Sequence, residues 1–197
     1  MSRTSVRERV LLAALDLFSQ KGYNSTSVDE IAEAANMKGP NLYKYFKNKD
    51  EIFLSLHVLM EENYRSNMSL DPEKYKVIRT SQDLKEFSLR QIRYTITNDN
   101  VRKLRKMCTI EQFRNDNLSA EASKHQFKNI REQYKTIFAG LMEAGVIEKT
   151  DPEMLAMEFF APATLLIQQC DREPEKTEEI IADIERYTDF FIAQHFK

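Results

Sequence analysis

The sequence predicts an all-α protein of about nine helices, in which a small N-terminal helical domain precedes a larger helical domain. Three observations predict this class. The 197 residues include only 4 glycines and 5 prolines, fewer than a turn-rich β fold needs. Apolar residues recur at spacings of three and four over most of the chain, as they do on one face of a helix. Residues typical of helix starts and ends flank the segments with this spacing.

The N-terminal domain, predicted at residues 1–48, begins with a helix over about residues 6–21. Gly22 follows it, at a position where helices often end in the left-handed conformation. A second helix is expected to start at a hydroxyl residue, with a carboxylate three positions later completing a capping box. The candidates are Thr26 or Ser27 for the hydroxyl and Asp29 or Glu30 for the carboxylate.

A short third helix is predicted over about residues 40–46, after a turn at 36–39. Pro40 suits the first turn of this helix because proline has no N–H to leave unpaired there, and Gly39 is the expected cap. Leu42 and Phe46 are four positions apart and are expected to face the core. The polar and aromatic side chains between them are therefore expected outside.

The larger domain, predicted at residues 49–197, contains the remaining helices. They are expected at about 49–67, 82–97, 100–115, 119–144, 153–169 and 174–196, with a linker over 69–81. The helix at 153–169 opens with Asp151 and Pro152, is apolar almost all round, and is expected to kink at Pro162. A helix without a polar face is buried on more than one side. We therefore expect a homodimer through the last two helices, about 153–169 and 174–196; the alternative is a central helix buried within a monomer.

Charge is distributed unevenly along the chain. The net charge is −2 overall, but residues 1–49 carry 8 Lys and Arg against 5 Asp and Glu, while the remainder is net −5. This asymmetry has the sign expected for a nucleic-acid-binding domain on a larger acidic domain. No apolar segment reaches the ~20 residues of a membrane span, and no signal peptide is recognisable. The expected location is the cytoplasm, without a membrane partner.

The residues that usually carry enzyme chemistry are scattered. The glycines stand singly at 22, 39, 140 and 145, so they form no phosphate-binding loop. The three histidines are far apart, and Cys108 and Cys170 lack the spacing of metal ligands. We expect two buried reduced thiols, no catalytic residue, no metal and no cofactor.

Residues 5–53 resemble the tetracycline-repressor (TetR) family of bacterial transcription regulators. The matching runs are VLLAALDLF at 10–18, GY at 22–23, TSVDEIA at 26–32 and KGPNLYKYFKNKDEI at 38–52, in order and at the family's spacing. The rest of the chain is similar only in being helical and of suitable length. The resemblance implies a homodimer of helical subunits that binds a double-stranded DNA operator through its N-terminal domain. It also implies that the larger domain dimerises and binds a small-molecule effector.

The resemblance carries the family's DNA contacts onto named positions. Its recognition surface falls on Lys38, Gly39, Pro40, Asn41, Tyr43, Lys44 and Tyr45, and its phosphate contacts fall on Ser27 and Lys49. The hydroxyl of Thr26, the neighbour of Ser27, is expected to contact phosphate as well.

The chemistry of these side chains fits that implied role. The N-terminus of a capped helix attracts phosphate, which suits Ser27. Asn41 has the donor and acceptor that match adenine, and Pro40 can contact a thymine methyl group. The third helix contains no arginine, the side chain that most often reads guanine. We therefore expect a palindromic operator with A·T-rich half-sites, read partly through DNA shape.

Effector-contacting residues can be nominated only as candidates, because each is also an ordinary core residue. They are His57, Met60, Tyr64, Phe87, Tyr94, Met107, Phe113, Tyr134, Phe138 and Phe159. Their aromatic and sulfur-bearing side chains would suit an apolar or aromatic molecule.

The sequence is compatible with three functions. The first is a ligand-responsive transcriptional repressor that binds its operator as a homodimer. The second is a helical adaptor that binds a protein through the apolar C-terminal helices, with a non-functional DNA-binding domain. The third is a small-molecule-binding or enzymatic protein for which DNA is incidental. Specific DNA binding that weakens steeply with salt favours the first.

Overall fold

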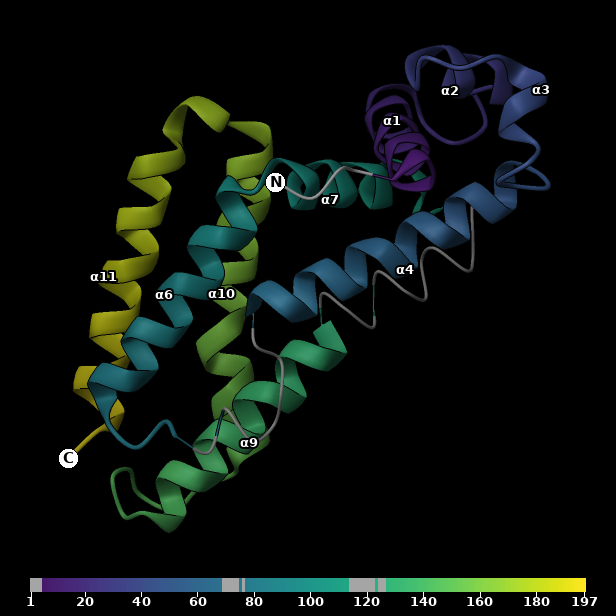
Figure 1. Ribbon diagram of the computed structural model, residues 1–197. Coiled ribbons are helices and arrows are strands. Elements are labelled where there is room, and N and C mark those ends of the chain that lie inside the picture. The colour runs from purple at the N-terminus through teal and green to yellow at the C-terminus, as the bar shows by residue number, and fades with distance from the viewer. Residues whose placement is uncertain (1–4, 69–74, 76, 114–122, 124–126) are drawn as a thin grey trace. The chain divides into compact units, whose positions relative to one another are not determined.

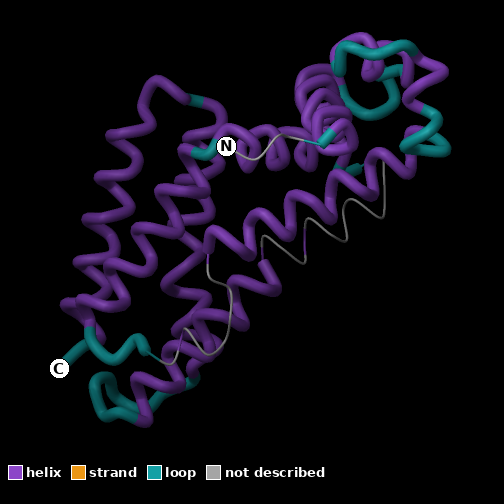
Figure 2. The backbone as a smooth tube through the Cα atoms, viewed as in Figure 1, coloured by secondary structure: helices purple, strands orange, loops and turns teal. Residues whose placement is uncertain are grey.

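A computed structural model describes residues 5–68, 75, 77–113, 123 and 127–197 (Figure 1). Its described elements are helices, apart from one isolated bridge between Ile147 and Phe196, so the predicted all-α class is confirmed (Figure 2). The chain packs into two units. The N-terminal unit comprises residues 1–67 and 99–119, and the C-terminal unit comprises residues 68–98 and 120–197.

The N-terminal unit contains five described helices. They are α1 (Val6–Lys21), α2 (Val28–Ala34), α3 (Gly39–Leu42), α4 (Lys49–Met68) and α7 (Asp99–Glu111). Helix α1 packs against both α2 and α7, and α2 packs against α3. Fully buried apolar side chains of this unit include Leu15, Phe18, Ile31, Leu42, Phe46, Ile52 and Leu56. Helices α4 and α7 pack in the same unit as the first three helices. The boundary between a DNA-binding domain and an effector-binding domain at residue 48 therefore remains a prediction.

The ends of α1 and α2 follow the capping rules that the sequence indicates. Gly22 ends α1 with φ 85°, in the left-handed region, and its N–H donates to Phe18 O. Ser27 caps α2, and Glu30 completes the capping box. After α2, Asn36 adopts φ 54°. The Met37 N–H then donates to Ala32 O at 2.9 Å, which closes the turn in the manner of a Schellman motif.

Helix α3 is shorter than predicted. It spans Gly39–Leu42, and its N-cap is Lys38 rather than Gly39. Beyond Leu42 the helical hydrogen bonds do not continue in series, because the N–H groups of Tyr45 and Phe46 both donate to Leu42 O, at 2.9 and 3.1 Å. Bonds between residues three apart belong to 3₁₀-type turns, which rarely extend. Residues 43–45 are accordingly a turn and not the second half of a helix.

The C-terminal unit is a group of packed helices. They are α6 (Ser81–Thr97), α9 (Asn129–Glu143), α10 (Pro152–Arg172) and α11 (Thr177–His195), with a short 3₁₀ helix, η2 (Pro174–Lys176), before α11. Helix α10 packs against α9, α11 and α6, and α11 also packs against α6 (Figure 1). One apolar cluster surrounds the rings of Phe138, Phe159 and Phe191, and a second contains isoleucines of α6 and α11.

Several predicted helix limits shift in this structure. Helix α7 ends at Glu111 rather than near residue 115, and α10 continues to Arg172 and passes through Pro162. Most of the predicted linker at 69–81 and most of the predicted helical segment at 119–128 lie outside the described residues. In the described part of the chain, no helix combines the length and the apolar character that crossing a lipid bilayer requires.

Candidate nucleic-acid interface

The short helix α3 and the turn after it expose polar and aromatic side chains next to two buried anchors. Leu42 is fully buried and Phe46 is 1% exposed, whereas Tyr43 is 55% exposed and Tyr45 is 39% exposed. Asn41 is also exposed. The other predicted members of this surface, Lys38, Pro40 and Lys44, are exposed as well, and Gly39 is half-buried. The structure therefore brings the predicted recognition residues together on one short exposed segment.

Gly39 is the first residue of α3 and lies close to α2. A Cβ atom added to it would lie 2.5 Å from Asp29 Oδ1 on α2. Real Cβ atoms do not approach an oxygen so closely, so any larger residue would push α3 and the Asp29 side chain apart. Because Asp29 is exposed, its carboxylate could turn aside, so the close approach at Gly39 constrains the Asp29 side chain first.

Arg7 of α1 holds the far end of this exposed segment. Its Nη1 donates to the main-chain oxygen of Tyr45 at 3.0 Å, and its Nη2 donates to Ser55 Oγ at 2.8 Å. Its guanidinium carbon also lies 4.4 Å from the centroid of the Phe46 ring. Sequence reasoning missed Arg7, because the contact joins residues 38 apart and no spacing rule connects them.

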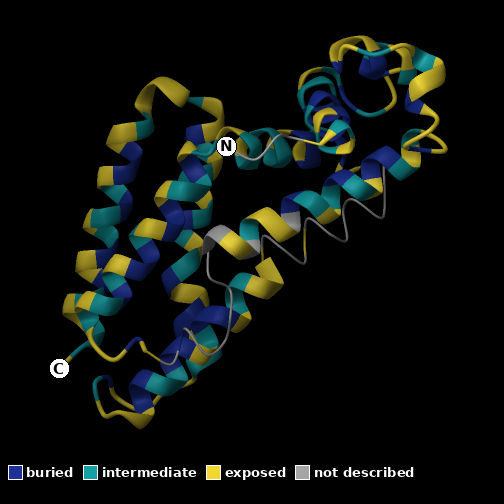
Figure 3. Ribbon diagram, viewed as in Figure 1, coloured by how far each residue is buried: buried dark blue, intermediate teal, exposed yellow. Residues whose placement is uncertain are grey.

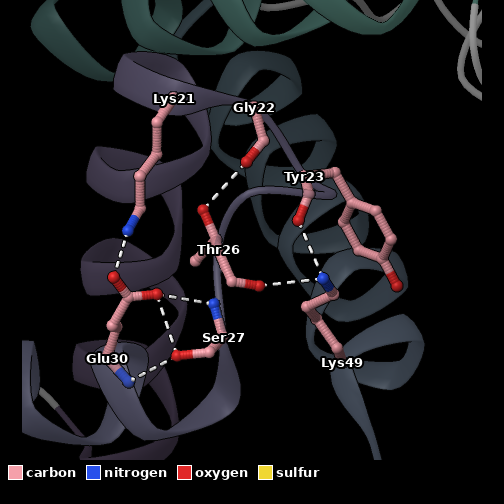
Figure 4. Close-up of polar contacts among 7 residues, drawn as sticks. All are labelled: Lys21, Gly22, Tyr23, Thr26, Ser27, Glu30 and Lys49. Atoms are coloured by element: carbon pink, nitrogen blue, oxygen red, sulfur yellow. Dashed lines mark hydrogen bonds and ion pairs between the residues drawn. The ribbon is translucent and has the colours of Figure 1, made fainter.

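Ser27 lies at the exposed N-terminus of α2 (Figure 4). Its Oγ accepts a hydrogen bond from the Glu30 N–H at 3.2 Å and contacts Glu30 Oε2 at 2.8 Å. Glu30 also contacts the ammonium group of Lys21. The bond to Lys21, followed by the bonds from Ser27, lowers the pKa of the Glu30 carboxyl to about 2. The predicted cap is thus present, and Glu30 already places a negative charge beside this helix end.

Two of the predicted phosphate contacts are instead occupied within the protein. Thr26 is buried, and its hydroxyl donates to Gly22 O at 2.8 Å. The ammonium group of Lys49 donates to Tyr23 O and to Thr26 O, both at 2.8 Å, and lies 4.3 Å from the centroid of the Tyr23 ring (Figure 4). These hydroxyl and ammonium groups fix the loop between α1 and α2. Contact of Thr26 and Lys49 with phosphate remains a prediction, and it is disfavoured because both groups already donate to main-chain oxygens.

Helix α7 supports the same loop from a distant part of the sequence. Glu111, only 1% exposed, accepts a 2.9 Å hydrogen bond from the main-chain N–H of Tyr23. Lys103 of α7 also pairs with Asp16 of α1 at 2.6 Å. Sequence reasoning missed Glu111, which occupies a helix end where a carboxylate is usually solvated.

The N-terminal unit also matches a known sequence family. The sequence profile of the bacterial regulatory proteins of the tetR family matches residues 10–56, which include most of α1, all of α2 and α3, and the first part of α4. The chain belongs to the TetR family. It is accordingly a helix-turn-helix regulator of transcription, and the relatives point to no family of enzymes.

Individual relatives agree with this assignment. The transcriptional regulator RutR of Escherichia coli O157:H7 is 23% identical over 155 residues, which are 79% of this chain and 70% of RutR. The negative transcriptional regulator IcaR of Staphylococcus epidermidis is 38% identical over 48 residues, which are 24% of this chain and 26% of IcaR.

Solved structures extend the similarity of fold to the whole chain. A TetR-family regulator from Mesorhizobium loti superposes with a TM-score of 0.74 at 20% identity, over 100% of both chains. SmeT, the repressor of the Stenotrophomonas maltophilia multidrug efflux pump SmeDEF, superposes with a TM-score of 0.72 at 19% identity, over 97% of this chain and 90% of SmeT. At these identities the likeness establishes the fold alone.

The ten effector-contact candidates of this TetR-family chain are divided between the two units. Phe87, Tyr134, Phe138 and Phe159 lie in the aromatic cluster of the C-terminal unit, and Tyr94 lies on α6. His57, Met60, Tyr64, Met107 and Phe113 belong to the N-terminal unit, where Phe113 is 91% exposed. The structure therefore brings together four of the candidates, and it packs them against one another as core.

The two helices predicted to dimerise carry exposed residues (Figure 3), and some of these residues are large and apolar. On α10, Met154 is 59% exposed and Leu165 is 67% exposed, and on α11 Phe190 is 62% exposed. Leaving large apolar groups in water is unfavourable, and contiguous patches of them usually mark an interaction surface. The identity of the dimer interface remains a prediction.

Proposed function

We propose that this TetR-family protein is a transcriptional repressor that works in the cytoplasm and binds a palindromic operator as a homodimer. One observation carries the DNA-binding part of this proposal. Asn41, Tyr43 and Tyr45 are exposed on a segment that two buried residues anchor to the core. A short, rigidly held segment with a carboxamide and two phenol groups suits the major groove, where side chains read base edges and donate to phosphates.

Each exposed side chain has a proposed part in this interface. The carboxamide of Asn41 bonds both polar groups of an adenine edge, and Pro40 packs on a thymine methyl group. Tyr43 donates to a phosphate oxygen, and Lys38 and Lys44 add positive charge to the segment. Because the segment contains no arginine, half-sites rich in A·T pairs are favoured.

Dimerisation is proposed through the exposed apolar faces of α10 and α11. Two copies of these helices form a four-helix interface around a two-fold axis. The same axis relates the two DNA-binding domains, so each enters one of two major grooves about 34–36 Å apart. This geometry makes the operator a palindrome.

Release from DNA is proposed to follow binding of a small apolar or aromatic effector in the C-terminal unit. The relatives support the class of function: IcaR is named as a negative regulator, and SmeT has been solved in complex with triclosan. The dimer has two conformations, one whose DNA-binding domains reach both half-sites and one whose domains do not. An effector that binds the second conformation more tightly than the first shifts the population away from DNA.

Selection of bound sequences from a random pool of duplex DNA tests the repressor proposal. We expect a palindrome with A·T-rich half-sites, bound with an affinity that falls steeply as salt rises. The Asn41→Ala variant should relax the preference at one base pair per half-site, whereas Tyr43→Phe should weaken binding to all sequences alike. Recovery of no enriched sequence, or of a sequence without two-fold symmetry, would contradict the proposal.

A further inference from the structure

The apolar core of the C-terminal unit contains a small group of buried polar side chains. Ser88 and Gln91 lie one turn apart on α6 and are 0% and 7% exposed, and Gln133 of α9 is 5% exposed. Apolar residues of the same helices, such as Phe87 and Tyr134, belong to the aromatic cluster of this unit. Uncharged polar groups buried in such surroundings are unfavourable unless they are hydrogen-bonded.

The hydrogen bonds of this group leave two polar atoms unused. Gln91 Nε2 donates to Gln133 Oε1 at 3.1 Å, and the hydroxyl of Tyr134 donates to Gln91 Oε1 at 3.2 Å. Both ends of the Gln91 amide are therefore engaged. Among the residues that the structure describes, neither Gln133 Nε2 nor Ser88 Oγ has a hydrogen-bond partner, although both atoms are buried.

Ser88 differs in this respect from hydroxyl residues elsewhere in these helices. The hydroxyls of Thr97, Thr164 and Thr188 each donate to the main-chain oxygen four residues earlier, at 2.8 to 3.0 Å. That bond is the usual way for a helical hydroxyl to satisfy itself. A buried serine that does not use it keeps a donor and an acceptor for another group.

We infer that Ser88 and Gln133 form the polar end of an effector site in the C-terminal unit, and that they bind an oxygen acceptor on an uncharged, largely apolar molecule. The Gln133 amide N–H and the Ser88 hydroxyl donate to this oxygen. The apolar part of the molecule packs against neighbouring side chains of the aromatic cluster. The inference rests on the proposed function only in naming this molecule an effector.

The charge of the molecule follows from the buried residues around it. The buried polar side chains described in the C-terminal unit are Ser88, Gln91, Gln133 and Thr188, and all four are uncharged. A charged ligand group among them would lose its hydration without gaining a counter-charge, which is strongly unfavourable. The site therefore selects neutral carbonyl or hydroxyl compounds over carboxylates and amines.

A matched pair of probes tests this inference. Acetophenone carries a carbonyl oxygen, and α-methylstyrene has the same shape with a CH₂ group in its place. The protein's preference is the dissociation constant of α-methylstyrene divided by that of acetophenone, measured by calorimetry or ligand-observed NMR. We expect this ratio to fall about fivefold in the Gln133→Leu variant and about fivefold in the Ser88→Ala variant. Comparing ratios removes the difference in hydrophobicity between the probes. Benzoate should not compete with acetophenone.

Thr188→Val is the control, since Thr188 is also buried in this unit but already donates to Ile184 O at 2.8 Å. It should leave the ratio unchanged. Without any probe, Ser88→Ala should raise the midpoint of thermal unfolding, because it removes a buried hydroxyl that has no partner, whereas Thr188→Val should lower it. A destabilised Ser88→Ala variant would overturn the inference. So would a ratio that is the same in all variants, or no binding of acetophenone up to its solubility limit.

These measurements use the full chain without DNA, so they separate the two proposals. If the ratio changes as expected while the random-pool selection enriches no sequence, the repressor proposal fails and the ligand site stands. If selection yields a palindrome while the ratio is unaffected, the ligand site alone fails.

Discussion

The guanidinium of Arg7 donates a 3.0 Å hydrogen bond to the main-chain oxygen of Tyr45, so α1 holds the end of the exposed segment that follows α3. The same group covers the ring of Phe46, the buried anchor of that segment. Position and orientation of the proposed DNA-reading residues thus depend on a side chain that belongs to a different helix.

Replacing Arg7 with alanine should weaken operator binding by about 1 kcal/mol, or roughly fivefold, without altering base preference. The reason is that the variant loosens Tyr43 and Tyr45 and removes no base contact. Fluorescence anisotropy with the selected operator measures the loss. Arg9→Ala, on the exposed side of α1, is the matched control for the lost charge. An equal loss in both variants would mean that charge, and not positioning, is responsible.

Lys49→Met is expected to destabilise the protein and to leave the salt dependence of DNA binding unchanged. Its ammonium donates to two carbonyls of the loop between α1 and α2, so removing it leaves Tyr23 O and Thr26 O without this donor. We expect a loss of about 1–3 kcal/mol in urea unfolding. A lysine that neutralises a phosphate would instead reduce the slope of log K against log salt by about 0.9. Lys47→Met, at an exposed position, should change neither stability nor loop structure.

Gly22→Ala should be more destabilising than Gly145→Ala, although both glycines have positive φ. The φ values are 85° and 72°, so alanine is strained at both positions, by about 1 kcal/mol or more. At Gly22 the ψ of 166° also places the backbone in a region that almost only glycine adopts. At Gly22 the new Cβ would also lie 2.7 Å from Glu111 Oε1, whereas at Gly145 no atom lies within 4 Å. The clash should add about 1–3 kcal/mol, measured by chemical unfolding. Equal effects of the two substitutions would contradict this prediction.

Acid should weaken the folded state partly through Glu30. Its pKa is lowered from 4.5 to about 2, first by the bond from Lys21 and then by those from Ser27. The carboxylate therefore contributes its stabilisation above pH 4.5 and loses it as the pH falls from about 4.5 to about 2. In Glu30→Gln, thermal unfolding midpoints should depend less on pH over this range than in the wild type. Glu33→Gln, exposed on the same helix, serves as the control.

Rules that relate residues close in sequence predicted several features of the proposed DNA-binding surface. The cap at Ser27, the left-handed Gly22 and the buried pair Leu42 and Phe46 follow from spacing and from backbone preferences. The length of α3 could not be predicted from these rules. The hydrogen bonds that form beyond Leu42 also depend on where tertiary contacts hold Phe46.

Contacts between distant residues could not be predicted in this way. The bond from Arg7 to Tyr45 joins residues 38 apart, and no local pattern marks either partner. Lys49 looked like a phosphate ligand because its charge and place fit that role, yet the nearest acceptors are two carbonyls of its own chain. The Ser88 hydroxyl and the Gln133 Nε2, neither of which has a described partner, could not be predicted either, since a serine or glutamine on a helix is usually solvated.

The carboxylate of Glu111 reaches the Tyr23 N–H from 88 residues further along the chain. Anyone building a chimeric regulator by fusing the first 48 residues to a foreign sensor would leave this support behind. A working transplant needs α4 and a stand-in for α7 that presents an acidic residue beneath the loop. The portable module is therefore a discontinuous one, and exchange of specificity between such regulators is easier by substituting the exposed residues around Asn41 than by cutting and joining chains.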